Sequence, residues 1–119
     1  MAEVTIQQLM DALPDFFVPD RAVGVNQIVQ LNLAGEKGGD WVVHIHDQQI
    51  DVNRGNVTHP DLAVSGNAQD VLDMFTGKLD PMRAYMLGRI RLAGSMSQAM
   101  KFSRYFDIDM KRLRSIGAE

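Results

Sequence analysis

The stretch WVVHIHDQQIDVNR, residues 41–54, decides the fold that we expect for this chain. Its first half alternates apolar residues with the pair His44 and His46, and successive side chains of a strand point to opposite faces of a sheet. This alternation puts three large apolar residues on one face: Trp41, Val43 and Ile45. A tight connection at 47–49 leads into a second alternating run, so residues 41–54 predict an antiparallel β-hairpin with one apolar face.

Further strand patterns surround this hairpin and extend over residues 24–66. Upstream, one face of an alternating run collects Val25, Gln27, Val29, Leu31 and Leu33. Downstream, residues 62–64 are expected to form a short fourth strand. The connections at 35–40 and 54–56 are short and carry Gly, Asn and Asp, which are typical turn residues. Short loops and half-apolar strands favour antiparallel pairing with one face of the sheet covered.

Helical patterns precede and follow the strands. Thr5 and Gln8 fit a capping box ahead of an apolar stripe at helical spacing. Pro14 is expected to stop or kink this first helix near Leu13, because proline lacks the backbone N–H that a helix interior needs.

Beyond the strands, the chain alternates short helices with one strand. Asn67 and Asp80 are expected to cap two helices, and residues 89–93 alternate as an edge strand whose arginines point outward. Helical spacing at 96–106 predicts another helix, one side of which is formed by Met96, Ala99, Met100, Ser103 and Phe106, and a last short helix follows it. A run of strands flanked by helices is an α+β pattern. We therefore expect a single α+β domain over residues 1–119, with the helices covering the apolar sheet face.

The composition is ordinary for a soluble globular domain and argues against several classes of function. The chain has 119 residues, 45% of them hydrophobic, and a formal net charge of −3. This acidic balance argues against broad nucleic-acid binding, which needs a basic patch. The absence of Cys excludes disulfides, thiolate nucleophiles and Cys-bound metals. No apolar run approaches the length of a membrane span and residues 1–4 lack a signal-peptide pattern, so we expect a cytoplasmic protein.

The best candidate for a metal site is the pair His44 and His46. Alternate residues of a strand point the same way, so both imidazoles could reach one metal ion. Cupin metal sites follow such a pair with a glutamate, whereas this chain offers Ile50 or Asp51. Because the other strand face already holds the apolar residues, we expect both histidines to face solvent and to bind no metal.

No other constellation indicates catalysis or a cofactor. His59 precedes a proline in a loop pattern, and no Ser or Thr nucleophile constellation accompanies it. Asp70 and Asp73 are explained by solvation and by the helix dipole after Asn67. The glycines at 35–39 lack the Gly-Lys-Ser/Thr ending of a phosphate-binding loop. We therefore expect a protein that is not an enzyme and holds no cofactor.

Methionine is the one residue type whose frequency stands out. It occurs 8 times, and five of these residues fall between Met74 and Met100. Its flexible, polarizable side chain fills irregular gaps in a core, and it also suits a pocket for variable apolar ligands. Both interpretations stay open at this point.

Residues 41–102 resemble the sterol carrier protein type 2 domain, a family of lipid carriers. The most specific segment is GKLDPMRAYMLGRIRLAG, from Gly77 to Gly94, which combines a Gly-x-Leu step, a short helix and a Gly-basic-Ile strand. Other matching features precede it in the family's order: Trp41, Ile50-Asp51-Val52, Gly55, Pro60-Asp61-Leu62 and Asp70-Val71-Leu72. The likeness extends more weakly to the helix and strands before residue 41.

The resemblance implies a largely antiparallel sheet of about five strands, covered on one face by helices, with an apolar tunnel between the layers. It also implies binding of fatty acyl chains, phospholipids or sterols without covalent chemistry. We expect the inward residues of both layers to form the tunnel lining or the closed core beside it: Val29, Leu31, Val43, Ile45, Leu72, Phe75, Met82, Met86, Ile90, Met96, Met100 and Phe106.

A second interpretation of the function remains open. The domain would then be an accessory or dimerisation module whose apolar face docks a partner enzyme or a second copy of the chain. Residues 101–119 hold five cations and three acids, a local net charge of +2, so a basic C-terminal helix could graze an anionic membrane. The alternative for this segment is a solvated helix face.

Overall fold

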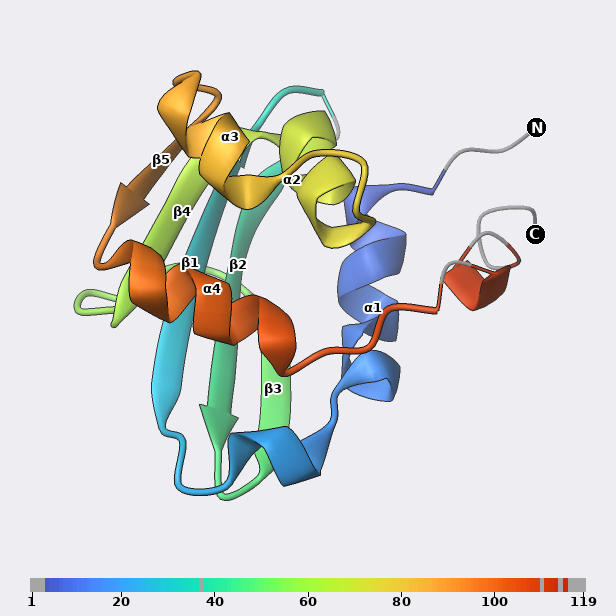
Figure 1. The fold of residues 1–119 in the computed structure, drawn as a ribbon, viewed down its shortest axis with the longest axis vertical. Helices are drawn as coiled ribbons and strands as arrows, with labels where there is room; N and C mark the ends of the chain where they lie inside the picture. Colours follow the sequence, from blue (N-terminus) through green and yellow to red (C-terminus); the bar gives the residue numbers. More distant parts are fainter. Residues whose placement is uncertain (1–3, 37, 110, 114, 116–119) are drawn as a thin grey trace.

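The computed structural model describes residues 4–36, 38–109, 111–113 and 115. One five-stranded sheet contains β1 (Gln27–Ala34), β2 (Gly39–His46), β3 (Gln49–Arg54), β4 (Leu62–Asn67) and β5 (Ile90–Ala93). The helical elements are α1 (Ile6–Phe16), the 3-10 helix η1 (Pro19–Ala22), α2 (Ala68–Phe75), α3 (Pro81–Met86) and α4 (Met96–Arg104). Helices α2, α3 and α4 lie in front of the sheet, and α1 runs along its β3 side (Figure 1).

The strand order is β3-β2-β1-β4-β5. The pairs β1–β2, β2–β3 and β4–β5 are antiparallel, whereas β1 and β4 are parallel. The predicted α+β class and largely antiparallel five-stranded sheet are therefore confirmed. The parallel pair joins two strands that the whole β2–β3 hairpin separates in sequence. In the strand order this pair lies in the interior of the sheet, with β2 and β3 on one side and β5 on the other.

The register gathers the apolar side chains of the sheet on one face. Leu31 of β1 lies between Trp41 of β2 and Val64 of β4, and all three residues are buried. The outer strands continue the same face with Ile50, Val52, Ile90 and Leu92. A sheet with one apolar face must be covered on that face, and the helices provide the cover.

The β2–β3 hairpin turns through Asp47 and Gln48, whose φ angles are 51° and 57°. Positive φ at both central residues is typical of the two-residue turn that matches the twist of an antiparallel hairpin. The resulting register pairs His44 with Asp51 across the two strands. The predicted hairpin is confirmed, and its turn determines which polar side chains face each other.

Helix α1 begins as the sequence predicts and ends later. The Gln8 N–H donates to Thr5 Oγ1 at 3.2 Å, and the Thr5 N–H donates to Gln8 Oε1 at 2.9 Å. The sequence predicts a stop or a kink near Leu13; the helix does not stop there, and α1 continues through Pro14 to Phe16. Pro14 lies in the last turn, where it removes a single backbone hydrogen bond. Burial of Leu13 and Phe16 against the core holds that turn in place.

Side-chain caps begin three of the helices. Asn67 begins α2, Asp80 begins α3 and Ser95 begins α4, and each accepts a hydrogen bond from a backbone N–H of the first turn. Strand β5 is an edge strand of the sheet, with Ile90 buried and Arg91 exposed, as predicted. Within the described residues, no helix has both the length and the hydropathy that crossing a bilayer requires.

Gln30 is a buried polar residue that fixes the 55–57 loop on the other face of the sheet. The residue is 3% exposed, and its Nε2 donates to the carbonyl oxygens of Gly55 at 3.0 Å and Trp41 at 3.2 Å. Its Oε1 accepts a hydrogen bond from the Val57 N–H at 2.9 Å. Because buried polar groups need partners, the loop and the amide satisfy each other.

Replacing Gln30 with Leu removes these hydrogen bonds and puts an apolar side chain of similar size in place of the amide. We expect Gln30→Leu to lower the free energy of unfolding by about 2 kcal/mol, because the Gly55 carbonyl and the Val57 N–H lose their partner. Urea unfolding followed by circular dichroism measures the change. The control is Gln98→Leu on the exposed side of α4, with an expected change below about 0.5 kcal/mol. Equal losses in the two variants would contradict this role of Gln30.

Candidate apolar ligand site

An apolar cavity of about 90 Å³ lies between the β1–β4–β5 part of the sheet and the helices α2 and α4. The sheet contributes Leu31, Leu62, Val64, Ile90 and Leu92. The helices and the segments after α2 and α4 contribute Val71, Met74, Phe75, Pro81, Met96, Ala99, Phe102, Ser103, Phe106 and Ile108.

The lining of this cavity is almost entirely apolar. Ser103 is the lining residue with a hydroxyl group, and its Oγ donates to the Met100 carbonyl oxygen within α4 at 2.7 Å. No charged side chain is among the lining residues. Such a surface gains free energy by contact with apolar atoms and offers no polar group to fix an orientation, so it suits an apolar ligand of variable shape.

A row of phenylalanines forms one wall of the cavity and continues beyond it. The ring centroids of Phe75 and Phe102 are 6.1 Å apart, and those of Phe102 and Phe106 are 5.2 Å apart. Phe17 extends the row at 5.9 Å from Phe106. Pairs in such tilted arrangements each contribute about 0.5–1.5 kcal/mol beyond burial. The row joins α2 to α4 and to the segment after α1.

The two ends of α4 are held differently. After its last residue, the Val18 N–H donates to the Tyr105 carbonyl oxygen at 2.8 Å, and the Asp107 N–H donates to the Phe16 carbonyl oxygen at 2.8 Å. At its first residue, Met96 is only half-buried. The C-terminal end is therefore fixed to the chain around α1, while the N-terminal end rests on the cavity.

The structure places most of the predicted core and lining residues on the covered side of the sheet. Five line the cavity: Leu31, Phe75, Ile90, Met96 and Phe106. Four lie in the closed core outside the cavity: Val29, Val43, Ile45 and Leu72. Contact of the lining residues with a ligand stays a prediction.

The prediction is wrong for Met82 and Met86, and Met100 lies outside the cavity. Met82 and Met86 are 41% and 77% exposed, and Met100 belongs neither to the buried core nor to the cavity lining. Helix α3 is six residues long and buries only Ala84, so its methionines point outward. On α4 the buried side chain is Phe102, whereas Met100 is only half-buried.

Several cavity residues escaped the sequence analysis, among them Leu62, Val64, Met74, Leu92 and Phe102. The predicted α4 stripe passed through Ser103 instead of Phe102. Residues four apart on a helix lie on the same side, so the pair Phe102 and Phe106 was the available signal. The alternation at 89–93 predicts that Leu92 faces inward, but which half of the sheet borders the cavity depends on the helices above it.

An exposed group of apolar side chains lies on and just after α3. It consists of Met82, Tyr85, Met86 and Leu87, which are 41%, 48%, 77% and 61% exposed, and we call it the α3 apolar surface. Four exposed cations flank it in sequence: Lys78, Arg83, Arg89 and Arg91. Pro81, the first residue of α3, lines the cavity, so the α3 apolar surface adjoins the cavity.

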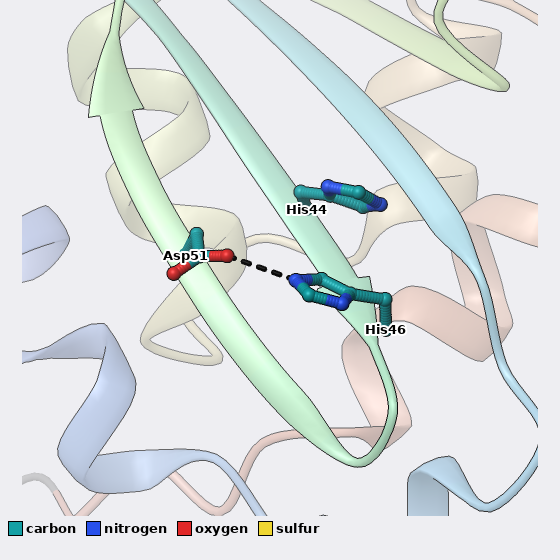
Figure 2. A group of neighbouring side chains, drawn as sticks. All are labelled: His44, His46 and Asp51. Atoms are coloured by element: carbon teal, nitrogen blue, oxygen red, sulfur yellow. Dashed lines mark hydrogen bonds and ion pairs between the residues drawn. The ribbon is translucent and has the colours of Figure 1, made fainter.

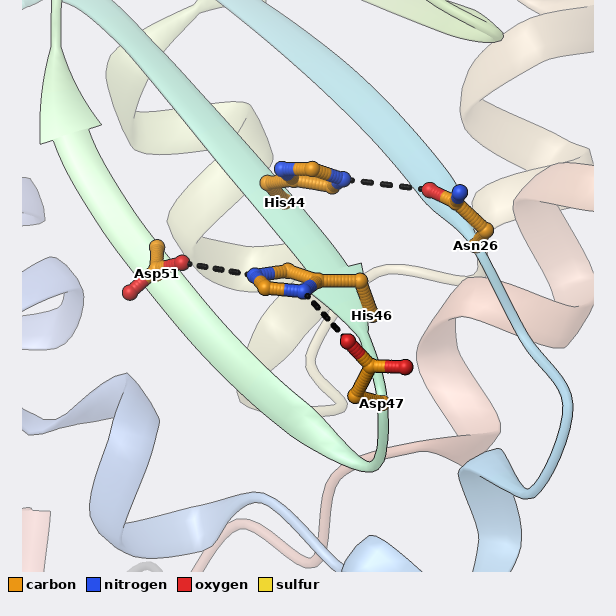
Figure 3. Close-up of polar contacts among 5 residues, drawn as sticks. All are labelled: Asn26, His44, His46, Asp47 and Asp51. Carbon is orange, nitrogen blue, oxygen red and sulfur yellow. Dashed lines mark hydrogen bonds and ion pairs between the residues drawn. The ribbon is translucent and has the colours of Figure 1, made fainter.

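A polar cluster occupies the opposite face of the sheet (Figure 2). His46 Nε2 lies 2.9 Å from Asp51 Oδ2, and the rings of His44 and His46 are 4.3 Å apart. Figure 3 adds Asn26, whose Oδ1 is 3.1 Å from His44 Nε2, and Asp47, whose Oδ2 is 3.4 Å from His46 Nδ1. The hydrogen bonds to Asp51 and then to Asp47 raise the pKa of His46 above its ordinary value. Both histidines lie on the face away from the core, as predicted, although they are half-buried.

Relatives of the chain are found among longer proteins. Hydroxysteroid dehydrogenase-like protein 2 of Xenopus tropicalis is 32% identical over 101 residues, which are 83% of this chain and 24% of that protein. The human protein of the same name is 30% identical over 103 residues. The chain thus spans about a quarter of the length of these curated relatives.

Solved structures share the fold. A palmitated sterol carrier protein 2-like 2 from Aedes aegypti matches with a TM-score of 0.62 and 21% identity, over 84% of this chain and 92% of that chain. The sec-alkylsulfatase Pisa1 from Pseudomonas sp. matches with a TM-score of 0.77 and 20% identity, over 85% of this chain and 16% of that chain. Residues 6–107 match the SCP-2 sterol transfer family, whose domains bind lipids or other apolar molecules. This chain therefore belongs to that family.

Proposed function

We propose that this chain binds the apolar part of a lipid, such as a fatty acyl chain, between the sheet and α4 and carries it without covalent chemistry. The observation that carries the proposal is the cavity itself, whose lining is apolar and whose one hydroxyl, on Ser103, is occupied within its own helix. The palmitated relative from Aedes aegypti supports an acyl chain as the ligand class. Burial would supply the affinity, at about 0.8 kcal/mol per methylene.

Binding requires the cavity to expand. Its volume of about 90 Å³ is well below the roughly 300–1,000 Å³ of pockets that enclose a drug-sized ligand. Helix α4 is the element whose displacement enlarges it, because Met96, Ala99 and Phe102 face the cavity from one side of this helix. Gly94, with φ of 124°, precedes Ser95, the N-cap of α4. A glycine allows the backbone angles to change there, so the helix axis can tilt. The N-terminal half of α4 then moves away from β5 while the bridge between Phe17 and Phe106 holds the other end.

We further propose that the α3 apolar surface contacts an anionic membrane when the lipid is exchanged. Residues 77–92 contain four cations and one acid, a net charge of +3, although the whole chain has a net charge of −3. The other 103 residues therefore carry eight cations and fourteen acids, or −6. Exposed apolar side chains surrounded by cations complement the interface of an anionic bilayer, where each Lys or Arg contributes about 1 kcal/mol.

This surface replaces the C-terminal helix as the favoured membrane contact. Residues 110, 114 and 116–119 of that segment lie outside the described residues, and its membrane contact stays a prediction. One of its cations, Arg112, is 3.3 Å from Asp15 and lies over the ring of Phe16 at 5.9 Å, which directs it toward α1. The α3 apolar surface also fits the accessory-module alternative, in which a partner protein or a second copy covers it.

A side chain that fills the cavity tests the binding site. We expect Ala99→Phe to weaken binding of a fluorescent fatty acid at least tenfold, because the new ring occupies the space beneath α4. Gln98→Phe, at the exposed neighbouring position, is the matched control and should bind as the parent does. Thermal melting by circular dichroism verifies that both variants fold. A folded Ala99→Phe protein with parental affinity would remove the cavity as the lipid site.

A charged substitution on α3 tests the membrane contact separately. Met86→Glu should leave affinity for the fluorescent fatty acid in solution unchanged, because the side chain is 77% exposed. It should slow transfer of the probe to vesicles of phosphatidylcholine and phosphatidylserine at least fivefold. Val23→Glu, at a side chain that is 68% exposed before β1, should leave transfer unchanged.

Arg83→Gln with Arg89→Gln should slow transfer to these anionic vesicles by roughly 30-fold, since each cation contributes about 1 kcal/mol, and should not affect transfer to neutral vesicles. Parental transfer rates in both α3 variants would contradict the membrane proposal. A dimer that light scattering detects in the parent, and that Met86→Glu dissociates, would favour the accessory-module alternative.

A further inference from the structure

We propose that His44, His46 and Asp51 form a binding site for one divalent transition-metal ion, with Zn²⁺ as the best fit. The three side chains each offer one ligand atom, and these atoms all lie within 4.8 Å of one another. The site is on the face of the sheet opposite to the cavity, so it neither uses nor requires the lipid-binding residues (Figure 2). Its success or failure is therefore independent of the proposed function.

Secondary structure holds the three ligands in place. His44 and His46 are two residues apart on β2 and thus share one face of the strand, and the hairpin register sets Asp51 of β3 directly opposite His44. The two imidazole rings already lie 4.3 Å apart with an angle of 33° between their planes. This is a site on two paired strands next to a tight turn, which limits the movement of its backbone.

The hydrogen bonds around the cluster are compatible with one ring nitrogen of each histidine serving as a metal ligand. Asn26 Oδ1 can only accept, so His44 Nε2 donates to it and the neutral ring keeps its lone pair on Nδ1. His46 bonds Asp47 through Nδ1 and Asp51 through Nε2 (Figure 3). Metal binding releases the proton between His46 Nε2 and Asp51 to solvent, and both atoms become ligands. Asn26 and Asp47 remain as outer partners that orient the rings, an arrangement typical of protein metal sites.

The donor set selects the class of metal. Two imidazole nitrogens and one carboxylate oxygen suit Zn²⁺, Cu²⁺ or Ni²⁺, whereas Mg²⁺ and Ca²⁺ prefer oxygen ligands alone. Tetrahedral Zn²⁺ with bonds of about 2.0–2.1 Å places neighbouring ligand atoms roughly 3.4 Å apart. In the structure the ligand atoms lie within 4.8 Å of one another, so rotations of the side chains must bring them closer together. Such rotations are open to these residues because Asp51 is exposed and both rings are only half-buried. Three protein ligands leave the fourth position to water.

The sequence predicts no metal here because the cupin pattern lacks its glutamate and because both histidines lie on the strand face away from the apolar residues. In cupin metal sites a glutamate follows the histidine pair along the chain, and this sequence has no glutamate at the corresponding place. The third ligand instead comes from the next strand, through the pairing of His44 with Asp51. Strand register, which the spacing of histidines does not encode, thus supplies the missing carboxylate.

Isothermal titration of the untagged, metal-free protein with ZnCl₂ tests the site. We expect one saturable site per chain with micromolar affinity, at least tenfold weaker in Asp51→Asn and at least 100-fold weaker in the His44→Gln/His46→Gln double variant. The matched control is His59→Gln, which removes the remaining histidine of the chain, exposed in the loop before β4, and should bind as the parent does.

Amide NMR spectra locate the ion independently of these variants. Zn²⁺ should shift the amides of β2, β3 and the loop at Asn26 and leave those of α4 unchanged. Absence of saturable binding by the parent at millimolar Zn²⁺ would overturn the proposal. Binding that His59→Gln loses, or that the double variant retains in full, would overturn it as well.

Discussion

The sheet is apolar on one face only, and the need to cover this face positions every helix labelled in Figure 1. At its centre, Leu31 packs between Trp41 and Val64, so the two halves of the sheet share one continuous apolar surface. Burying such surface contributes about 25 cal/mol per Å². The same constraint leaves the other face to polar side chains, among them Gln30 and the cluster around His46.

The helical cover is tight over one half of the sheet and loose over the other. Helix α1 inserts Ile6, Leu9 and Leu13, each at most 2% exposed, so its inward side is tightly packed against the core. Helix α4 buries Phe102 but leaves Met96 and Ala99 half-buried. The cavity lies under this looser helix. The proposed lipid site is thus the part of the core whose packing is incomplete, and the same incompleteness allows α4 to move.

The two faces of the sheet carry separate chemistry. The covered face offers apolar side chains and no free polar group at the cavity, which favours binding of a chain of methylenes with little selectivity. The open face brings two imidazoles and a carboxylate together at a tight turn, which favours a cation. Strand β2 contributes to both, because Trp41, Val43 and Ile45 point into the core while His44 and His46 point away from it.

The sequence by itself determined the elements and the inward face of the sheet, because these depend on local periodicity and capping. The alternation in residues 41–54, the caps Asn67 and Asp80, and the edge strand at 89–93 all have the predicted structure. Only the tertiary structure decided the parallel pairing of β1 with β4, since no local pattern records which distant strands become neighbours. It also decided that Met86 is exposed and Phe102 buried, because the orientation of a short helix follows from what it packs against. The partnership of Asp51 with the histidines has the same origin: register is set by the turn through Asp47 and Gln48.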